Sequence, residues 1–377
     1  MRADSSNAGV GAPLRLVDDV LVAENGRRFV YFGGCDYLRL SRHPAVHAAV
    51  CRALREHGLN VAASRATTGN HALYEELETE LARFFGVEAA VLAASGYATN
   101  LLVAQTLAGL ASHVLIDARA HPSLTDAAGL ISPRVTRFAH RRVPNLERRL
   151  GRLPGGARPV IMTDGLFARD GALAPLGGYL EVCPRNGWLV VDDAHGAGVL
   201  GGQGRGTPEL CGVHSPRLIH TITLSKAFGV FGGAVLTTRR LAERVRRGSR
   251  LFRGSTPMPL PLAAGALASL RVWQADGARR ARLGANIARL RAALGGGGLV
   301  GPEPASPVVS VQATSPAAAG RLRRLLRRRG IYPSCIRYPG ATEAGYFRFA
   351  LSSEHTGRQV DMLAETLLAC PGLRWLP

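Results

Sequence analysis

Short apolar runs recur along the chain, and longer amphipathic stretches separate them. Such runs lie at 89–94, 113–117, 158–164, 188–191, 218–224 and 232–238. An apolar run of this length without polar alternation is typical of a strand buried on both faces, as in a parallel sheet. Because helical segments lie between these runs, the chain is predicted to have an α/β fold, with a mostly parallel central sheet flanked by helices.

The helices are predicted from hydrophobic spacing and from the residues at their ends. In residues 73–85, leucine and phenylalanine side chains recur at helical spacing and form one apolar face. Pro44 lies in the first turn of a helix predicted over 41–57, with Ser41 as its candidate cap. Further helices are predicted at 176–186, 261–294, 316–329 and 356–369, and an Asn-Gly pair predicts a hairpin within 14–32.

The pattern changes in the last quarter of the chain. Four consecutive glycines at 295–298 cannot hold a helix and mark a linker or a turn. Beyond them, the last predicted helices alternate with strands predicted at 307–312, 331–337 and 345–351. The expected organisation is an N-terminal segment (1–45), a large domain (46–285) and a smaller C-terminal α+β domain (286–377).

Composition places the chain among ordinary globular proteins. It has 377 residues, of which 46% are hydrophobic, and no apolar run approaches the roughly 18 residues of a membrane span. The N-terminus shows no targeting peptide. No Cys-x-x-Cys pair occurs among the cysteines, which are Cys35, Cys51, Cys183, Cys211, Cys335 and Cys370. This usage predicts reduced thiols in the cytoplasm, without a disulfide framework or a zinc site.

A formal net charge of +20 raises nucleic-acid binding as a rival function. The densest basic run, 321–329, carries leucines at helical spacing, so its arginines are expected to cover the solvated faces of a helix. No aromatic residue interleaves with these arginines, and no zinc-finger or RNA-binding signature is present. Nucleic acid is therefore not expected as a partner, but the charge could attract an acidic one, such as coenzyme A or an acyl carrier protein.

Lys226 is the only lysine in the chain, so the other 46 of the 47 basic positions are arginines. Codon bias in a GC-rich genome explains the arginines. A guanidinium group serves for salt bridges and phosphate contacts, but it stays protonated and cannot attack a carbonyl. A desolvated lysine amine can lose its proton and form a Schiff base with an aldehyde. We therefore expect Lys226 to have been kept for covalent chemistry.

The residues around Lys226 fit one cofactor. Asp192, Asp193 and His195 follow the apolar run 188–191, at the end of a strand where open α/β sheets bind ligands. Lys226 comes just after the next predicted strand. A lysine that holds an aldehyde, beside an acid that keeps a pyridine nitrogen protonated, predicts a pyridoxal phosphate (PLP) site.

The chain resembles the α-oxoamine synthases, which are PLP-dependent enzymes of fold type I. The motifs that carry this resemblance are Asp36-Tyr37-Leu38, Ser95-Gly96-Tyr97-Ala98-Thr99-Asn100, Val191-Asp192-Asp193-Ala194-His195-Gly196, Gly201 to Gly206, Thr223-Leu224-Ser225-Lys226 and Ser255-Thr256-Pro257-Met258-Pro259. They cover nearly the whole chain in order. The family includes 8-amino-7-oxononanoate synthase and serine palmitoyltransferase, and the motifs alone do not select a member.

The resemblance assigns roles to individual residues. The residues implied to carry the chemistry are Lys226, His121, Asp192 and His195. The residues implied to contact the cofactor are Gly96, Tyr97, His121, Asp192, His195, Thr223, Lys226, Ser255 and Thr256. Within this set, Asp192 is expected to contact the ring nitrogen and His195 the phenolic oxygen. His121 is expected to stack on the ring and is a candidate proton shuttle.

Further roles implied by the resemblance concern the phosphate and the substrate. Gly96 and Tyr97 open a helix whose N-terminus would bind the cofactor phosphate. Ser255 and Thr256 would reach the phosphate of a neighbouring subunit, in a homodimer with the active site at the subunit interface. Arg348 would grip the carboxylate of the amino acid substrate with two donors.

The chain also departs from the family pattern. Tyr74 stands where many members have histidine, and Ala168 stands where many have a serine near the phenolic oxygen. The segment 59–72 is poor in glycine, and the N-terminal segment is short. These departures favour a specialised branch of the family.

The function implied is a decarboxylative Claisen-type condensation. A small amino acid would react with an acyl thioester, carried by coenzyme A or an acyl carrier protein, to give an α-amino ketone. An aminotransferase of the same fold is the alternative enzyme, and a basic nucleic-acid-binding protein is the alternative outside enzymes.

Overall fold

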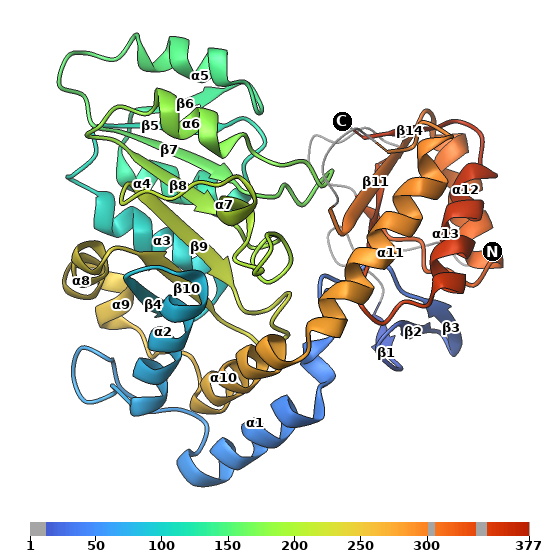
Figure 1. The fold of residues 1–377 in the computed structure, drawn as a ribbon, viewed down its shortest axis with the longest axis horizontal. Helices are drawn as coiled ribbons and strands as arrows, with labels where there is room; N and C mark the ends of the chain where they lie inside the picture. Colours follow the sequence, from blue (N-terminus) through green and yellow to red (C-terminus); the bar gives the residue numbers. More distant parts are fainter. Residues whose placement is uncertain (1–12, 301–305, 337–344, 377) are drawn as a thin grey trace, which may run out of the picture.

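The computed structural model describes residues 13–300, 306–336 and 345–376. They form a large lobe around a seven-stranded sheet and a small lobe around a four-stranded sheet (Figure 1). The large sheet has the order β4 (Ala89–Ala93), β10 (Gly233–Thr237), β9 (Leu218–Thr223), β8 (Trp188–Asp192), β7 (Pro159–Asp164), β5 (His113–Asp117) and β6 (Val135–Phe138). Only β10 runs antiparallel to its neighbours. The predicted α/β fold with a mostly parallel sheet is confirmed.

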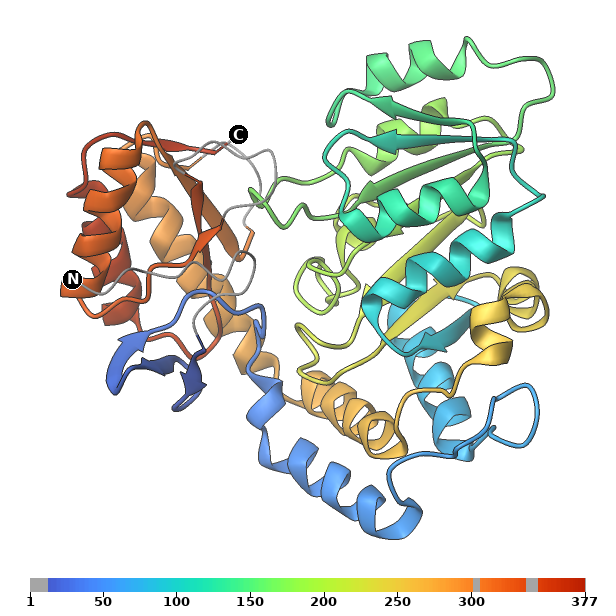
Figure 2. The same cartoon turned by 180° about the vertical axis from the view of Figure 1, so that it is seen from behind.

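Helices cover both faces of the large sheet because alternate apolar side chains of each strand point to opposite sides. On β7, Val160 and Met162 pack with the helices of one face, and Ile161 packs with those of the other. The first face, turned forward in Figure 2, is covered by α3 (Gly96–Leu107), α4 (Pro122–Ile131) and α8 (Arg239–Gly248). The other face is covered by α2 (Ala72–Phe85), α5 (Val143–Leu150), α6 (Leu176–Val182) and α10 (Leu260–Ala275). The remaining large-lobe helices are η1 (Leu40–Arg42), α1 (Pro44–His57), α7 (Thr207–Leu210) and α9 (Arg250–Gly254).

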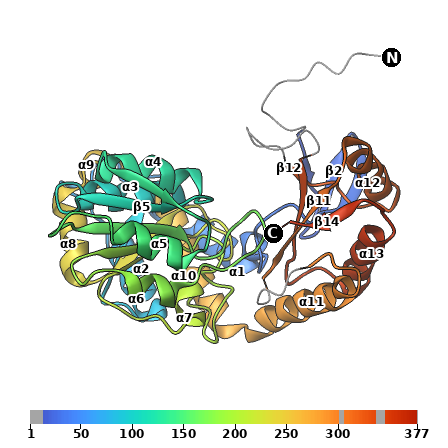
Figure 3. The ribbon, with the colours of Figure 1, turned by 90° about the horizontal axis from the view of Figure 1, so that it is seen from above.

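The small lobe is built on an antiparallel sheet with the order β12 (Cys335–Ile336), β13 (Tyr346–Ala350), β11 (Val308–Ala313) and β14 (Leu373–Trp375). Helices α11 (Gly277–Gly295), α12 (Pro316–Arg328) and α13 (Gly357–Leu368) pack on it. A meander of β1 (Arg15–Leu16), β2 (Leu21–Glu24) and β3 (Arg27–Val30) lies beside this lobe (Figures 1 and 3). Backbone bonds attach the meander to it: the Val30 amide donates to Gly330, and the Ala350 amide donates to Phe32. The proposed boundary at 285/286 falls inside α11, which joins the two lobes (Figure 3).

Several predicted elements differ from the structure at their ends. Ser41 lies within η1, and His43 caps α1 instead by accepting a hydrogen bond from the Ala45 amide at 3.2 Å. The stretch 261–294 forms two helices, because Asp276 ends α10 and its side chain caps α11. The helix predicted over 176–186 ends at Val182. Pro184 follows two residues later, and a proline disfavours helical geometry in the residue before it, here Cys183.

Other local predictions are confirmed or only partly described. The hairpin over 14–32 forms between β2 and β3, and Asn25 and Gly26 both take positive φ at its turn. The strand expected over 331–337 is reduced to β12, and residue 337 lies outside the described residues. No helix of the described ranges has both the length and the apolarity that a bilayer crossing requires.

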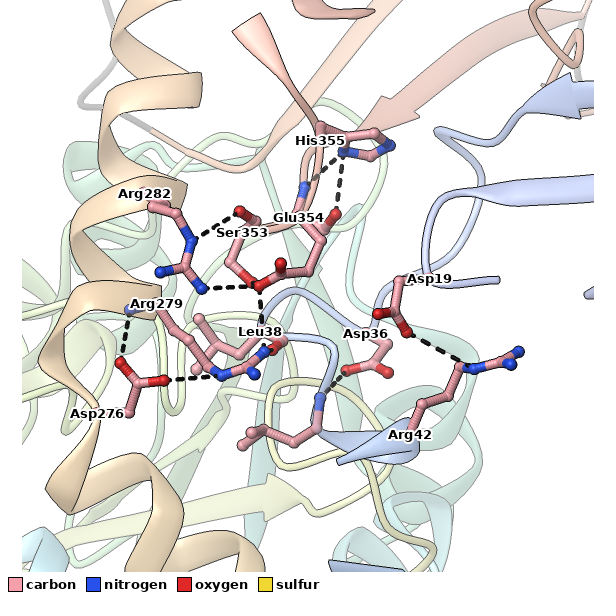
Figure 4. A network of polar contacts seen from close by, with 12 residues as sticks. Asp19, Asp36, Leu38, Arg42, Asp276, Arg279, Arg282, Ser353, Glu354 and His355 are labelled. Atoms are coloured by element: carbon pink, nitrogen blue, oxygen red, sulfur yellow. Dashed lines mark hydrogen bonds and ion pairs between the residues drawn. The ribbon is translucent and has the colours of Figure 1, made fainter. Parts of the chain in front are cut away.

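The two lobes are held together where α11 begins (Figure 4). Arg279 donates to the Asp276 carboxylate at 3.0 Å, to the Leu38 carbonyl at 3.1 Å and to the Glu354 carboxylate at 3.1 Å. Arg282 adds a second bond to Glu354 at 2.9 Å. These bonds connect the helix that joins the lobes with the 36–41 loop and with the segment that follows β13. The network therefore fixes the 36–41 loop relative to both lobes.

His355, at the edge of this network, makes the stability of the fold sensitive to acid. Its buried ring stacks on Phe32 with centroids 4.1 Å apart, and its nitrogens contact the Ser352 amide and the Tyr31 carbonyl. Burial, followed by the positive charge of Arg39, lowers the pKa of His355 to about 3. An unfolded histidine has a pKa near 6.5, so between these values only the unfolded chain binds the proton. The unfolding free energy should therefore fall by about 1.4 kcal/mol per pH unit below pH ~6 on account of this residue.

Urea unfolding of the wild type and of His355→Asn at pH 7.0 and pH 5.5 measures this effect. Asparagine can still accept from the Ser352 amide, but it does not titrate. The wild type should lose more unfolding free energy between the two pH values than the variant does. Equal losses would contradict the assignment.

Candidate active site

The candidate site lies where β7, β8 and β9 end, on the side of the small lobe (Figure 1). These strands are parallel neighbours, and Asp164 pairs in register with Asp192 across β7 and β8. Thr223 ends β9, and Lys226 follows within the tight turn that leads to β10. The sheet thus gathers the predicted acid and the predicted lysine at one edge.

Lys226 contacts one of its predicted partners directly. Its Nζ lies 2.7 Å from Nε2 of His195, which follows β8. The other ring nitrogen of His195, Nδ1, lies 2.6 Å from the hydroxyl of Tyr37, a fully buried residue of the loop before η1. These three side chains form a chain of hydrogen bonds from the 36–41 loop to the lysine.

Desolvation disfavours the charged forms of Lys226 and His195 in this chain of hydrogen bonds. Desolvation lowers the pKa of Lys226; Cys35, Asp192 and Asp164 oppose that shift, and Arg348 adds to it. Desolvation also lowers the pKa of His195 well below its usual value, and the positive charges of Lys226 and Arg348 act in the same direction. An uncharged amine at this position is the form that can attack an aldehyde.

Asp192 is held by buried polar side chains of the neighbouring helices. Asn100 of α3 donates from Nδ2 to its Oδ2 at 2.7 Å, and the Ser123 hydroxyl lies 3.4 Å from the same oxygen. Ser123 also lies 2.7 Å from Nδ1 of His121, which caps α4. The carboxylate is thus oriented through α3 and α4, and the same contacts connect it with His121.

The second acid of the Asp-Asp-Ala-His motif has a structural role. Asp193 is fully buried and accepts from the Thr207 amide at 2.7 Å, from the Thr207 hydroxyl at 2.6 Å and from His220 at 3.1 Å. A Cβ at Gly206 would lie 1.9 Å from its carboxylate, so only glycine fits there. Asp193 therefore anchors the loop that carries the Gly201 to Gly206 motif.

Asp164 is a third buried acid at this edge of the sheet. It accepts a hydrogen bond from the backbone amide of His121 at 2.9 Å. Burial, followed by the negative charge of Asp192, raises the pKa of Asp164 well above its usual range. The charged form of Asp164 is therefore disfavoured, next to the position from which Asp192 would act.

The residues predicted to bind the cofactor phosphate lie beside β9. A Cβ on Gly96 would lie 2.7 Å from the Cβ of Thr223, so the first turn of α3 packs closely against the end of that strand. The hydroxyls of Thr223 and Ser225 lie 2.7 Å apart at the same point. Tyr97 is largely exposed and donates from its hydroxyl to Asp126. Hydroxyls beside a glycine at a helix N-terminus fit a phosphate group, as the cradle for PLP requires.

Arg348 is the residue that the small lobe contributes to the site. From β13, its Nη1 donates to the Ala168 carbonyl at 3.4 Å, and its Nη2 lies 3.5 Å from the Cys35 sulfur. The positive charge of Arg348 helps to lower the pKa of both Lys226 and His195, because the guanidinium lies near this pair. The position is suited to holding the carboxylate of a substrate at the junction of the lobes.

The predicted Ser255 and Thr256 lie in the loop between α9 and α10. The Ser255 hydroxyl donates to the Leu251 carbonyl at 2.6 Å, and both residues line a small cavity together with Ala98 of α3. Their contact with the phosphate of a neighbouring subunit stays a prediction.

Sequence reasoning missed four residues of this neighbourhood: Tyr37, Ser123, Asp164 and Cys35. Asn100 stood within a motif quoted for the resemblance, but its contact with Asp192 was not predicted. Two signals were present. Tyr37 belongs to a motif quoted for the resemblance, and Asp164 ends an apolar run just as Asp192 does. The cysteine and serine carried no comparable signal.

The chain is similar to known proteins over most of its length. The profile of the family described as aminotransferase class I and II matches residues 28–367. An 8-amino-7-oxononanoate synthase from Thioalkalivibrio sulfidiphilus is 37% identical over 91% of this chain and 88% of its own. A serine palmitoyltransferase from S. paucimobilis, solved with a bound PLP–myriocin aldimine, superposes with a TM-score of 0.87 at 28% identity and covers 94% of this chain and 90% of its own. An 8-amino-7-oxononanoate synthase from Francisella tularensis superposes with a TM-score of 0.78 at 28% identity, covering 90% and 97% of the two chains.

Proposed function

Because this chain belongs to the aminotransferase class I and II family, and within it to the PLP-dependent α-oxoamine synthases of fold type I, we propose that it joins a small amino acid to an acyl thioester. Carbon dioxide and a thiol leave, and an α-amino ketone is formed. The observation that carries the proposal is the partly buried amine of Lys226, which lies 2.7 Å from His195 and is acted on by the charge of Asp192.

Asp192, Lys226 and Arg348 are proposed to have different roles in the reaction. When bound, PLP supplies an aldehyde that takes up the amino acid and a protonated ring that draws electrons from its α-carbon. Asp192, oriented by Asn100, is suited to keep the proton on the ring nitrogen. Lys226, whose pKa desolvation lowers, is suited to remove the α-proton as a general base. Arg348 is suited to hold the carboxylate with paired donors until it leaves as carbon dioxide.

Other residues are proposed to bind the cofactor and to shield it. Gly96, Tyr97, Thr223 and Ser225 surround the place proposed for the phosphate. His121, fixed by its bond to Ser123, is proposed to cover one face of the ring. Closure of the site by the small lobe would keep water from the reacting carbon.

The experiment that tests the proposal is an assay of full-length protein with PLP and a matrix of substrates. Glycine, alanine and serine are each combined with acyl thioesters of several chain lengths, on coenzyme A and on an acyl carrier protein. We expect thiol and carbon dioxide to appear together, and only when both substrates are present. Accumulation of pyridoxamine phosphate with an amino acid alone would indicate an aminotransferase instead.

We further propose a homodimer in which Ser255 and Thr256 of one subunit serve the phosphate of the other. Thr256 is exposed beside the first turn of α3, where a second copy could meet it. Two inactive variants, Lys226→Arg and the double variant Ser255→Ala/Thr256→Ala, should regain activity when they are refolded together. Mixed subunits would then contain one complete site. No recovery in mixtures shown to contain mixed dimers would contradict the shared site.

A further inference from the structure

Both ring nitrogens of His195 are occupied in the structure. Nδ1 faces the Tyr37 hydroxyl at 2.6 Å, and Nε2 faces the Lys226 amine at 2.7 Å. A neutral imidazole has one N–H donor and one bare nitrogen, so it must donate to one of these partners and accept from the other. The position of this single proton decides what His195 can offer to the site.

We propose that Tyr37 is a positioning residue: its hydroxyl donates to Nδ1 of His195 and thereby fixes the ring as the Nε2–H tautomer. His195 then presents a hydrogen-bond donor toward Lys226. This assignment concerns the chain's own side chains and does not depend on which substrates the enzyme takes.

The surroundings exclude a charged His195. The ring is buried, and Lys226, Arg348 and His121 all act to lower its pKa, after the larger effect of burial. An imidazolium would place a positive charge near the Arg348 guanidinium. Only the two neutral tautomers therefore compete.

The Tyr37 hydroxyl is the better donor of the pair. Burial raises the pKa of Tyr37 well above its usual value, so the oxygen keeps its proton. That proton could point to Nδ1 or to the Cys35 sulfur. Imidazole nitrogen is a strong acceptor and a thiol sulfur is a weak one. Donation to Nδ1 is therefore favoured, and the Tyr37 and His195 rings already meet edge-on, with centroids 6.2 Å apart.

The tautomer has a consequence for the lysine. An Nε2–H group donates to an uncharged amine but repels an ammonium ion, so it favours the neutral form of Lys226. The other groups whose charges act on this amine are Cys35, Asp192, Asp164 and Arg348. Tyr37 thus contributes, through His195, to the reactivity of a lysine that it does not touch. The same N–H would meet the phenolic oxygen that the family resemblance places near His195.

Two measurements on the full-length chain test the proposal. Nitrogen NMR of protein labelled in histidine, with His195→Gln to assign the signal, reports the tautomer with and without added PLP. Because Lys226 is the only lysine, an amine-selective reagent followed by peptide mapping reports its reactivity against pH. Tyr37→Phe removes the hydroxyl and keeps the buried ring. Tyr179→Phe is the matched control, since that buried hydroxyl lies 3.5 Å from Asp117 on β5, away from the lysine.

In the wild type and in Tyr179→Phe, we expect His195 to carry its proton on Nε2. In Tyr37→Phe, we expect the preference to be lost and modification of Lys226 near pH 8 to slow by about three- to tenfold, the worth of one hydrogen bond. A wild-type ring protonated on Nδ1 would overturn the proposal, even if Tyr37→Phe did not fold. An unchanged tautomer together with unchanged lysine reactivity in Tyr37→Phe would overturn it as well.

Discussion

Replacing Lys226 by arginine should lower product formation by roughly 10³-fold or more, because the variant keeps a positive charge and loses the only side-chain amine. The guanidinium cannot give up a proton at working pH, so it can neither bond to the cofactor aldehyde nor act as a base. Release of thiol from the acyl thioester, followed with a chromogenic reagent, measures the rate. Residual activity near the wild-type level would end the assignment of Lys226.

A second readout separates lost chemistry from lost folding. Borohydride reduction of the wild type with PLP should fix the cofactor on the peptide that contains Lys226, and it should fix none in Lys226→Arg. The matched control is Arg358→Lys on the exposed side of α13, which introduces a second lysine away from the site. That variant should keep its activity and carry the cofactor on Lys226 alone. Labelling of the introduced lysine to the same extent would show that the reaction is not directed by the site.

The central sheet was predictable because its strands are buried on both faces. Runs such as 188–191 and 218–224 admit no helical periodicity, and the structure places them as adjacent strands β8 and β9. Weaker elements escaped prediction. Strand β6 reads Val-Thr-Arg-Phe at the edge of the sheet, where only one of its residues is buried, so its sequence lacks the apolar signal. Helix ends were displaced where a side chain such as Asp276 supplies a cap within an apolar stretch.

The part of the site that could be predicted is the part that depends on the type of residue present. A lone lysine and an acid at a strand end need no structure to be noticed, and β8 and β9 bring them to one edge. The support for these residues comes from distant segments. Asn100 precedes its partner Asp192 by 92 positions, and Tyr37 precedes His195 by 158. Nothing in either sequence neighbourhood encodes such a pairing. Only the packing of α3 and of the 36–41 loop against the sheet creates it.

Replacing Asp192 by asparagine should lower product formation by roughly 10²- to 10³-fold, the usual effect of removing one oriented charge from a catalytic site. The amide is nearly the same size and can still accept from Asn100, so the fold should persist. It carries no negative charge, however, and cannot keep a proton on the ring nitrogen. Without that proton the ring withdraws electrons poorly, and the α-proton of the substrate becomes harder to remove.

Two comparisons make this prediction specific to charge on the ring nitrogen. Asp164→Asn alters the adjacent acid, whose charged form is already disfavoured by burial and by Asp192, so its rate should change only slightly. A PLP analogue methylated on the ring nitrogen carries a permanent positive charge and does not need the carboxylate. It should restore part of the activity of Asp192→Asn and give no gain in the wild type. If the two asparagine variants were equally impaired and the analogue restored neither, Asp192 would act by shape rather than by charge.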